Sequence, residues 1–558
     1  MSAAEYRSGQ PRPSNRAMST SRSTVVGRVV GGLARSKADA AVLGVFTETG
    51  MLSGEPVGRY GRLRTVEVAT ILCESMRPVR SVLTAAATIF PLLSCHLVTR
   101  SGAASPADFS TSNPVEVWVT TGDERLLLAR QRNLPFDSAK SAATDVIEVD
   151  PTQRYQRMVG FGAAMTDASA WLIQNRMSAE DREKLMQDLF GRDGVGFSFV
   201  RVPMGASDFS QRHYSYDDAT GAAEESGLDR FSIAPDKEAK LPLLRRALEI
   251  NPALKVMASP WSAPGWMKTT GSLIKGTLRV ESYDAFATYF VKFIRAYAAE
   301  SVPIYAITLQ NEPNFEPENY PGMRLDAKAR AELIGKNFGP MFAREGISTL
   351  ILDWDHNWDL PQQPIDVLSD SVARKYVQGV AWHCYAGEVG AQSVVHDRYP
   401  DKDAYFTECS GGEWSPKFDE NLKWTVANLV IGSTRNWARG VLMWNLALDE
   451  NHGPHLGGCD NCRGVVTIDS VSGEYDREVE YYALGHASKF VRPGAWRVAS
   501  SGGGTDLSHV AFLNADDSSR VLIVLNSSGD RRRFTVRDGS NAFSYELPRS
   551  SVASFVWR

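Results

Sequence analysis

The sequence predicts an α/β fold, a (β/α)8 TIM barrel with an attached β-sandwich domain. First, eight short apolar runs alternate with longer helical stretches between residues 157 and 484, the pattern of repeated βα units. Second, almost every apolar run ends in polar or aromatic residues, as barrel strands do next to an active site. Third, strand-like segments flank this region in residues 114–156 and 485–558.

The composition limits the possible partners. The chain has 558 residues, enough for a barrel and one smaller domain. Hydrophobic residues make up 43% and charged residues 23%, which is typical of globular proteins. The formal net charge of −4 provides no basic field to neutralise phosphates, so nucleic acid is not an expected partner.

Residues 76–94 have the pattern of a secretory signal peptide. A basic start, Met76-Arg-Pro-Val-Arg80, precedes an apolar run from Val82 to Leu93 that is too short to span a bilayer. The ending Leu92-Leu-Ser-Cys95 resembles the bacterial lipoprotein signal, which is cut before a cysteine that is then acylated. The alternative is an ordinary signal peptide cut near residues 103 and 104. Either pattern predicts export, with Cys95 as a possible membrane tether in the periplasm or outer membrane.

Residues 1–75 precede this signal, although export machinery normally reads a signal at the true N-terminus. We expect them to be disordered or to result from a start codon assigned too early; an Arg/Ser-rich targeting arm is the other interpretation. Residues 95–113 are rich in Ser, Ala, Thr and Pro, which indicates a flexible tether.

The flanking segments predict the β-sandwich. Val115-Glu-Val-Trp-Val-Thr-Thr121 alternates apolar and polar residues, as a half-buried strand does. We expect this opening part to pair with strands after residue 485, which are predicted at Val510–Leu513, Arg520–Leu525, Arg533–Val536 and Val552–Trp557.

The barrel region, residues 157–484, contains eight candidate strands and clear helical stretches such as Ala179–Leu189 and Tyr283–Tyr297. The candidate strands are Met158–Phe161, Phe197–Val202, Lys255–Ser259, Tyr305–Gln310, Thr349–Asp353, Gly379–His383, Ala404–Thr407 and Gly440–Trp444. The residues at their ends are Thr166-Asp167, Arg201, Trp261, Asn311-Glu312, Asp353 to Asp355, His383 with Tyr385, Glu408, and Trp444-Asn445. In a barrel these ends meet at one face.

Two glutamates carry the predicted chemistry. Thr308-Leu-Gln-Asn-Glu-Pro-Asn314 ends the fourth strand, and Tyr405-Phe-Thr-Glu-Cys409 ends the seventh, so Glu312 and Glu408 should face one pocket. A single acidic residue among the chain's 65 is normally a solvated surface group, but strand-end placement argues for function here. Glycoside hydrolysis requires such a pair of carboxylates.

A series of motifs resembles glycoside hydrolase family 30, in particular the bacterial relatives of glucosylceramidase. The matching stretches are Gly160-Phe-Gly-Ala-Ala-Met-Thr-Asp-Ala168, Arg201-Val-Pro-Met204, Ala258-Ser-Pro-Trp261, Asn311-Glu-Pro313, Glu408, Trp444-Asn-Leu-Ala-Leu448 and Leu484-Gly-His-Ala-Ser-Lys-Phe490. The resemblance covers residues 150–558. It implies a retaining β-glycosidase that hydrolyses β-glucosidic bonds by double displacement and resembles glucosylceramidase.

The resemblance implies that Glu408 is the nucleophile and Glu312 the acid/base, with carboxyl groups about 5 Å apart. Because an ionised Glu408 disfavours a second anion nearby, we expect Glu312 to keep its proton at higher pH than a free glutamate. Arg201 should lie near Glu408 and keep it ionised; the alternative is a purely structural ion pair.

Further residues are assigned to substrate binding. The resemblance places Asn311 beside the sugar 2-hydroxyl, and Asp167, Trp261 and Trp444 around the sugar. His383 and Tyr385 should face the same way on their strand, with Cys384 turned toward the helices. Tyr385 can hydrogen-bond Glu408, whereas His383 contacts the sugar, lies behind the site or is merely structural.

The cysteines suggest structural roles and no metal or cofactor is expected. We expect Cys409 to pack behind the barrel wall. Cys459 and Cys462 suit a local disulfide, with a zinc half-site near His452 and His455 or a redox pair as alternatives. Metal-binding and dinucleotide-binding sequence motifs are absent.

The substrate is a β-glycoside, either a glycolipid or a glucan. The loop Gly453-Pro-His-Leu-Gly-Gly-Cys-Asp-Asn-Cys-Arg-Gly464 differs from that of lysosomal glucosylceramidase and looks like bacterial members of the family. Loops of this kind contact the leaving group of the substrate. The sequence therefore leaves open glucosylceramide, a β-1,6-glucan attacked in exo or endo mode, and other β-glycosides. A non-catalytic carbohydrate-binding lipoprotein is a remote alternative, and the oligomeric state is open.

Overall fold

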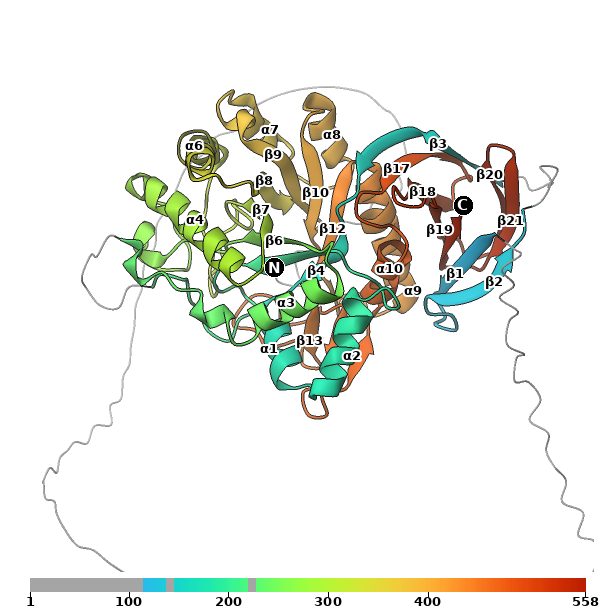
Figure 1. Cartoon of the computed structure of the whole chain (residues 1–558), viewed down its shortest axis with the longest axis horizontal. Helices are drawn as coiled ribbons and strands as arrows, with labels where there is room; N and C mark the ends of the chain where they lie inside the picture. Colours follow the sequence, from blue (N-terminus) through green and yellow to red (C-terminus); the bar gives the residue numbers. More distant parts are fainter. Residues whose placement is uncertain (1–113, 137–144, 219–226) are drawn as a thin grey trace, which may run out of the picture. The chain divides into compact units, whose positions relative to one another are not determined.

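A computed structural model of the chain describes residues 114–136, 145–218 and 227–558. The predicted fold class is confirmed, because eight parallel strands close into a barrel and a second, nine-stranded sheet lies beside it (Figure 1). Within the described residues, no helix has the length and apolar character needed to cross a membrane. The predictions for residues 1–75, 76–94 and 95–113, including Cys95, fall outside the described residues.

All eight predicted barrel strands are present, with small differences at their ends. Around the barrel the order is β10, β12, β4, β5, β6, β7, β8 and β9, each parallel to its neighbours. Their bounds are β4 Gly160–Ala164, β5 Phe199–Pro203, β6 Lys255–Ser259, β7 Ile304–Thr308, β8 Leu350–Asn357, β9 Val377–His383, β10 Asp403–Glu408 and β12 Ala438–Asn445.

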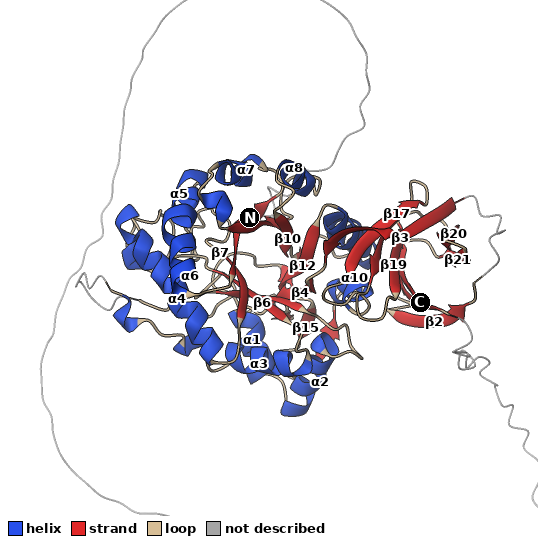
Figure 2. Ribbon diagram, turned by 45° about the horizontal axis from the view of Figure 1, so that its top comes forward, coloured by secondary structure: helices blue, strands red, loops and turns tan. Residues whose placement is uncertain are grey.

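Helices follow every barrel strand and surround the barrel in Figure 2. Polar caps begin several of them; Thr166 and Ser178 each accept a hydrogen bond from a backbone N–H in the first turn of the helix that follows. The helices are α1 Asp167–Asn175, α2 Ala179–Phe190, α3 Lys240–Ile250, α4 Tyr283–Ala299, α5 Ala327–Glu332, α6 Gly339–Glu345, α7 Gln362–Ser369, α8 Ala391–Arg398, α9 Phe418–Thr425 and α10 Val479–Ser488.

The barrel interior has an apolar layer beneath a polar one. The apolar layer takes one buried residue from each of seven strands, Phe199, Met257, Ala306, Leu352, Ala381, Tyr405 and Leu442, which pack together. Two residues further along five of these strands stand the buried polar side chains Arg201, Ser259, Thr308, His383 and Thr407. Because side chains two apart on a strand face the same way, these five polar side chains form a layer above the apolar one, which we call the polar floor.

Strand β8 is irregular where it reaches this floor. Its register with β9 shifts between Trp354 and His356, which marks a β-bulge. Trp354 and Asp355 both have positive φ angles, 77° and 59°, a conformation that costs a non-glycine residue about 1–3 kcal/mol. The bulge turns Asp355, which is fully buried, into the barrel interior.

The second domain is one continuous sheet in the order β2-β1-β22-β19-β18-β17-β3-β20-β21. Residues from both ends of its strand order, including Val117, Phe543 and Phe555, share one apolar core, so the sheet folds over on itself. The strands are β1 Val115–Thr121, β2 Ala129–Leu134, β3 Asp145–Arg157, β17 Trp496–Gly502, β18 Leu507–Leu513, β19 Arg520–Asn526, β20 Arg532–Asp538, β21 Asn541–Leu547 and β22 Ser551–Trp557.

A buried histidine links the last barrel helix to this sheet. His486 in α10 contacts the Ser554 hydroxyl through Nδ1, at 2.8 Å, and the Thr120 hydroxyl through Nε2, at 2.9 Å. Burial lowers the pKa of His486 to about 3, so the imidazole is neutral in the folded protein.

We expect His486 to make the folded state acid-sensitive. Its pKa in the folded protein lies below the ordinary value of 6.5, so its contribution to stability is fully present above pH 6.5 and is lost as the pH falls toward 3. Glutamine at this position should flatten the pH dependence of the free energy of unfolding by up to about 1.4 kcal/mol per pH unit in that range. Urea unfolding at several pH values measures this slope. Ser554→Ala keeps the imidazole and should keep the wild-type slope; equal slopes in wild type and His486→Gln would contradict the expectation.

Candidate active site

One pocket opens where the barrel strands end, with a cavity volume of about 330 Å³. Both predicted glutamates line it, together with the predicted residues Trp261, Asn311, Tyr385 and Trp444. The other lining residues are Asp208, Asn314, Phe315, Tyr320, His356, Asn357, Asp359, Leu360, Ala386, Trp414, Cys459, Asn461 and Cys462. The mixture of carboxyl, amide and aromatic side chains suits a sugar, which offers hydroxyl groups and an apolar ring face.

Glu408 ends β10 and has both predicted partners. Arg201 on β5 donates to Oε2 through Nη1, and the Tyr385 hydroxyl donates to Oε1 at 3.0 Å. Arg201 is fully buried, and its other terminal nitrogen donates to Asn311 and Asp355 at 2.7 and 2.8 Å. This fixes Glu408 in one orientation toward the pocket.

Asp355 is the centre of the polar floor. It accepts hydrogen bonds from side chains on five other barrel strands: Arg201, Ser259, Thr308, His383 and Thr407. Burial alone would raise the pKa of Asp355, but Arg201 and His383 hold it well below its usual range. Asp355 is therefore a permanent anion.

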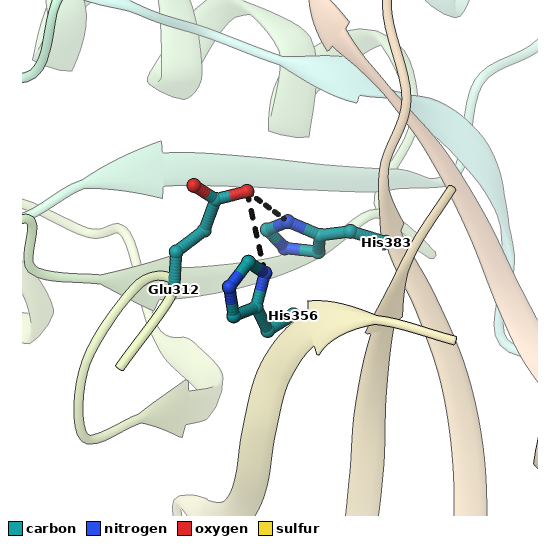
Figure 3. A group of neighbouring side chains, drawn as sticks. All are labelled: Glu312, His356 and His383. Atoms are coloured by element: carbon teal, nitrogen blue, oxygen red, sulfur yellow. Dashed lines mark hydrogen bonds and ion pairs between the residues drawn. The ribbon is translucent and has the colours of Figure 1, made fainter. Parts of the chain in front are cut away.

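Glu312 follows β7 in a constrained conformation. Its φ angle is positive, 48°, and its backbone N–H donates to the carbonyl of Asp355 at 3.0 Å. The carboxylate Oε1 lies 3.2 Å from Nδ1 of His383 and 3.5 Å from Nδ1 of His356 (Figure 3). The same His383 nitrogen lies 4.0 Å from Oε1 of Glu408, so one imidazole faces both glutamates.

These contacts correct the expected protonation of Glu312. Burial raises its pKa, but the imidazoles of His356 and His383 outweigh burial, and the net pKa is lowered. The sequence predicted the opposite because it considered only the charge of Glu408. Burial raises the pKa of Glu408 above its ordinary value; His383 and, as predicted, Arg201 oppose that shift but do not reverse it.

His383 is the basic partner in this group. Burial alone would lower its pKa, but the charge of Glu408 and the hydrogen bonds to Asp355 and Glu312 raise it to about 9. His383 is fully buried and does not line the pocket, so the structure gives it no contact with a sugar. Its place is behind the site.

Ligand atoms of Glu312, His356 and His383 lie within 4.8 Å of one another, a spacing that also occurs around metal ions. Both His383 nitrogens, however, lie at hydrogen-bond distance from carboxylates, and with a pKa of about 9 the ring carries protons on both. The contacts of His383 are therefore hydrogen bonds to two carboxylates.

Two indoles form an aromatic wall of the pocket. The rings of Trp261 and Trp444 stack with centroids 4.8 Å apart and planes 20° apart, and the Arg201 guanidinium lies 4.8 Å from the Trp261 ring. Asn311 accepts from Arg201 through Oδ1, which fixes the orientation of its amide and leaves the NH2 group free to donate to a substrate.

Asp167 is not among the residues that line the pocket, and its predicted contact with the sugar stays a prediction. It lies in the first turn of α1, where its carboxylate accepts from Ser210 and Tyr214 and pairs with the buried Lys240 at 2.9 Å. Another carboxyl group, that of Asp208 in the loop after β5, lines the pocket.

Asp208 is buried in the pocket wall. Burial, with the charge of Glu408 in addition, raises its pKa to about 8. Asp167 holds the loop that carries Asp208, because Ser210 donates to Asp167 and accepts from the backbone of Ser207 at 3.0 Å. Asp167 thus positions a pocket residue, in addition to the sugar contact predicted for it.

The cysteines form two disulfides among the described residues. Cys384 and Cys409 are bonded to each other, a disulfide that the sequence did not predict; Cys409 lies in the main hydrophobic core and Cys384 packs against it. The bond connects the residue after His383 to the residue after Glu408. Cys459 and Cys462 form the local disulfide that the sequence favoured, and both line the pocket.

A short β-ladder fixes that second disulfide. Strand β11, Gly411–Gly412, pairs with β14, Cys462–Arg463, and the Arg463 side chain is bound by the buried Glu480 at 2.9 Å. Trp414, just after β11, also lines the pocket. One wall is therefore built from loops after β10 and β12 and not from strands.

Sequence reasoning missed Asp208, His356, Trp414 and Asn461, which line the pocket, and the role of Asp355. Asp355 and His356 lie at a predicted strand end and could have been found there. The loop residues carry no local signal, because only the folded chain brings them to the strand ends.

Known proteins match the whole described fold. A model of the glycosyl hydrolase family 30 TIM-barrel domain matches residues 158–491, and one of the family 30 beta sandwich domain matches residues 494–555. An endo-1,6-beta-D-glucanase of Neurospora crassa is 37% identical over 427 residues, 74% of this chain and 87% of that protein. The lysosomal acid glucosylceramidase of Mus musculus is 31% identical over 441 residues, 74% of this chain and 83% of that protein.

Solved structures agree with these matches. The structure of an endo-beta1,6-glucanase superposes with a TM-score of 0.75 at 34% sequence identity, covering 80% of this chain and 99% of that one. The SrfJ protein of Salmonella typhimurium superposes with a TM-score of 0.74 at 26% identity, with the same coverage of both chains.

Alanine substitutions at Asp208 and Asp167 should distinguish a residue that binds the sugar from one that stabilises the surrounding structure. Asp208→Ala removes a carboxyl from the pocket and should lower kcat/KM on a nitrophenyl β-glycoside by about 10- to 100-fold, at an unchanged melting temperature. Asp167→Ala leaves Lys240 with Asp236 as its one remaining carboxylate partner and should lower the melting temperature. Steady-state kinetics and thermal unfolding of both variants measure the difference. A larger loss of kcat/KM in a stable Asp167→Ala would assign the sugar contact to Asp167.

Proposed function

Because the chain belongs to glycoside hydrolase family 30, we propose that it hydrolyses internal β-1,6-glucosidic bonds of a glucan with retention of anomeric configuration. The observation that carries this proposal is the pair of buried carboxylates in one pocket, Glu408 and Glu312, which face the same His383 nitrogen from 4.0 and 3.2 Å. In a retaining glycosidase, one carboxylate of such a pair attacks the anomeric carbon and the other serves as acid and base.

In the first step, Glu408 attacks the anomeric carbon and Glu312 protonates the departing oxygen. Arg201 and Tyr385 orient the attacking carboxylate. As the ester forms, negative charge leaves Glu408, and the hydrogen bond from Tyr385 weakens. The bond to the leaving oxygen breaks as that oxygen receives its proton, so no free alkoxide is released.

In the second step, Glu312 acts as a base. It takes a proton from water, which attacks the anomeric carbon and releases Glu408 as a carboxylate. Two displacements on the same carbon restore the original configuration. Glu312 recovers its proton, so one residue serves both steps.

The relatives support a β-1,6-glucan as the substrate. Fungal endo-1,6-beta-glucanases are up to 37% identical to this chain, whereas the mouse glucosylceramidase is 31% identical. The indoles of Trp261 and Trp444, with Asp208 and Asn311, provide faces and hydrogen-bonding groups for one glucose ring.

Glucosylceramide is the second candidate. Phe315, Tyr320 and Leu360 line the pocket, and Leu360 is 42% exposed, so an apolar leaving group would find apolar contacts there. This agrees with the 31% identity to a lysosomal acid glucosylceramidase.

Glutamine substitutions should test the mechanism. Glu408→Gln should lower kcat by at least about 1,000-fold on every substrate, because the nucleophile is lost. Glu312→Gln should affect β-1,6-glucan strongly and 2,4-dinitrophenyl β-glucoside much less, because dinitrophenolate departs without a proton. Proton NMR of the first product gives its anomeric configuration, and product sizes distinguish internal from terminal cleavage.

The outcomes separate the candidates. Release of the β-anomer from β-1,6-glucan as a mixture of oligosaccharides would support the proposal. Preference for glucosylceramide would select the second candidate, and first release of the α-anomer would exclude the retaining mechanism. A non-catalytic carbohydrate-binding lipoprotein would bind glucan and cleave none of these substrates.

We also propose that the protein is exported and tethered through Cys95. The two disulfides among the described residues support an oxidising compartment. Expression of the full chain in a bacterial host, followed by mass measurement of the mature protein, should give a chain beginning at a lipid-modified Cys95. An unmodified N-terminus near residue 104 would indicate secretion without a tether, and retention of residues 1–75 would contradict export.

A further inference from the structure

His383 is a fully buried histidine placed between two carboxylates. Its Nε2 lies 3.1 Å from Asp355 Oδ1 and its Nδ1 lies 3.2 Å from Glu312 Oε1. The side chain ends β9, whereas Asp355 comes from the bulge of β8 and Glu312 follows β7. Three neighbouring strands thus align a chain of three titratable groups that leads from the barrel floor to the pocket.

The floor fixes the tautomer of this imidazole. Asp355 is a buried anion that accepts hydrogen bonds from hydroxyl groups of Ser259, Thr308 and Thr407, and from Arg201. An anion accepts and does not donate, so Nε2 of His383 must carry a proton. Proton exchange is then confined to Nδ1, the nitrogen that faces Glu312.

In the free enzyme, the contact between Nδ1 and Glu312 requires one shared proton. Without it, two lone pairs would face each other at 3.2 Å in a buried site. Either Glu312 is a carboxylic acid that donates to neutral His383, or the imidazolium donates to the carboxylate. In both cases the acid proton of the site belongs to the pair.

Other charged groups favour the imidazolium before substrate binds. Glu408 Oε1 lies 4.0 Å from Nδ1, and Asp355 contacts the other nitrogen, so two anions flank the ring in addition to Glu312. The opposing cation, Arg201, is bound to Asp355 and Glu408 and not to the ring. Burial lowers the pKa of His356, on β8, and Tyr385, on the loop after β9, donates to Glu408.

We propose that His383, oriented by Asp355, stores the proton that Glu312 delivers to the leaving group. This deepens the proposed function and rests on Glu312 being its acid/base. In the free enzyme Nδ1 holds the proton and Glu312 is a carboxylate. When the glycosidic oxygen displaces water from Glu312, the proton moves from Nδ1 to Oε1 over one hydrogen bond and then to the leaving oxygen.

The proton balance closes over the two steps. After the first step His383 is neutral with its proton on Nε2, Glu312 is a carboxylate, and Glu408 is an uncharged ester. Water then gives one proton to Glu312 as its oxygen bonds to the anomeric carbon. When Glu408 becomes an anion again, its charge draws that proton back to His383. His383 is therefore a positioning residue for the proton and never touches the sugar.

NMR of protein labelled with 15N-histidine tests this without any substrate. The wild type should show the signals of one imidazole that are absent in His383→Gln. In this ring Nε2 should stay protonated throughout, and Nδ1 should lose its proton with a pKa of about 9. Glu312→Gln removes the facing anion and should lower that midpoint by at least one pH unit. His356→Gln is the matched control and should shift it less. An unprotonated Nδ1 at pH 7, or no response to Glu312→Gln, would overturn the proposal.

The pH dependence of activity is the second readout. In His383→Gln or His383→Asn, the alkaline limb of kcat/KM should move down by more than one pH unit, because Glu312 must hold the proton alone. The loss of kcat should be at least tenfold larger on β-1,6-glucan than on 2,4-dinitrophenyl β-glucoside. Equal losses on both substrates with an unmoved limb would indicate a purely structural role and overturn the proposal.

The two hypotheses fail in different ways. If the wild type cleaves neither glucoside, the proposed function fails, and the NMR titration still decides where the proton lies. If the wild type is active but Nδ1 is unprotonated, the function stands and only the proton store is excluded.

Discussion

The hydrogen-bonded carboxylate of Asp355 is the interaction on which the rest of the site depends. Five barrel strands each send a donor to it, and the backbone carbonyl of the same residue binds Glu312. A buried anion is tolerated only when such bonds replace water. The positive φ angles of Trp354 and Asp355 are the conformational cost of bringing this anion inside, and the five bonds offset that cost.

The site is also a problem of charge balance in a dry interior. Arg201 and His383 are cations, and Asp355 and Glu408 are their anionic partners, with Glu312 bound at the edge. At low dielectric no one of these charges can change without affecting the others. Loss of charge from one glutamate therefore alters the proton affinity of the second through His383, which is what a two-step reaction with one acid/base requires.

The sequence was sufficient to predict the elements in which apolar residues recur with a regular period. All eight barrel strands and the placement of Glu312 and Glu408 could be predicted, because apolar runs and strand-end residues are local signals. Strand β2, Ala129–Leu134, was missed because its residues are mostly polar. Asp167 was named because it belongs to a motif, whereas Asp208 carries no local signal and only the folded chain shows that it lines the pocket.

The Cys384–Cys409 bond shows the same limit from another side. The alternation of side chains along a strand predicted that Cys384 points away from the pocket. The alternation did not indicate that Cys384 pairs with Cys409, which follows the neighbouring strand. Pairing depends on the register of β9 with β10, where His383 lies beside Glu408 across a register shift. The cysteines that follow these two residues have a Cα separation of 5.4 Å, so the disulfide forms at the same irregular part of the strand pair that places His383 beside Glu408.

The residues that transfer protons and form the covalent bond therefore lie on strands that the disulfide connects. The wall that selects the leaving group rests on loops, which are free to vary between relatives with different substrates.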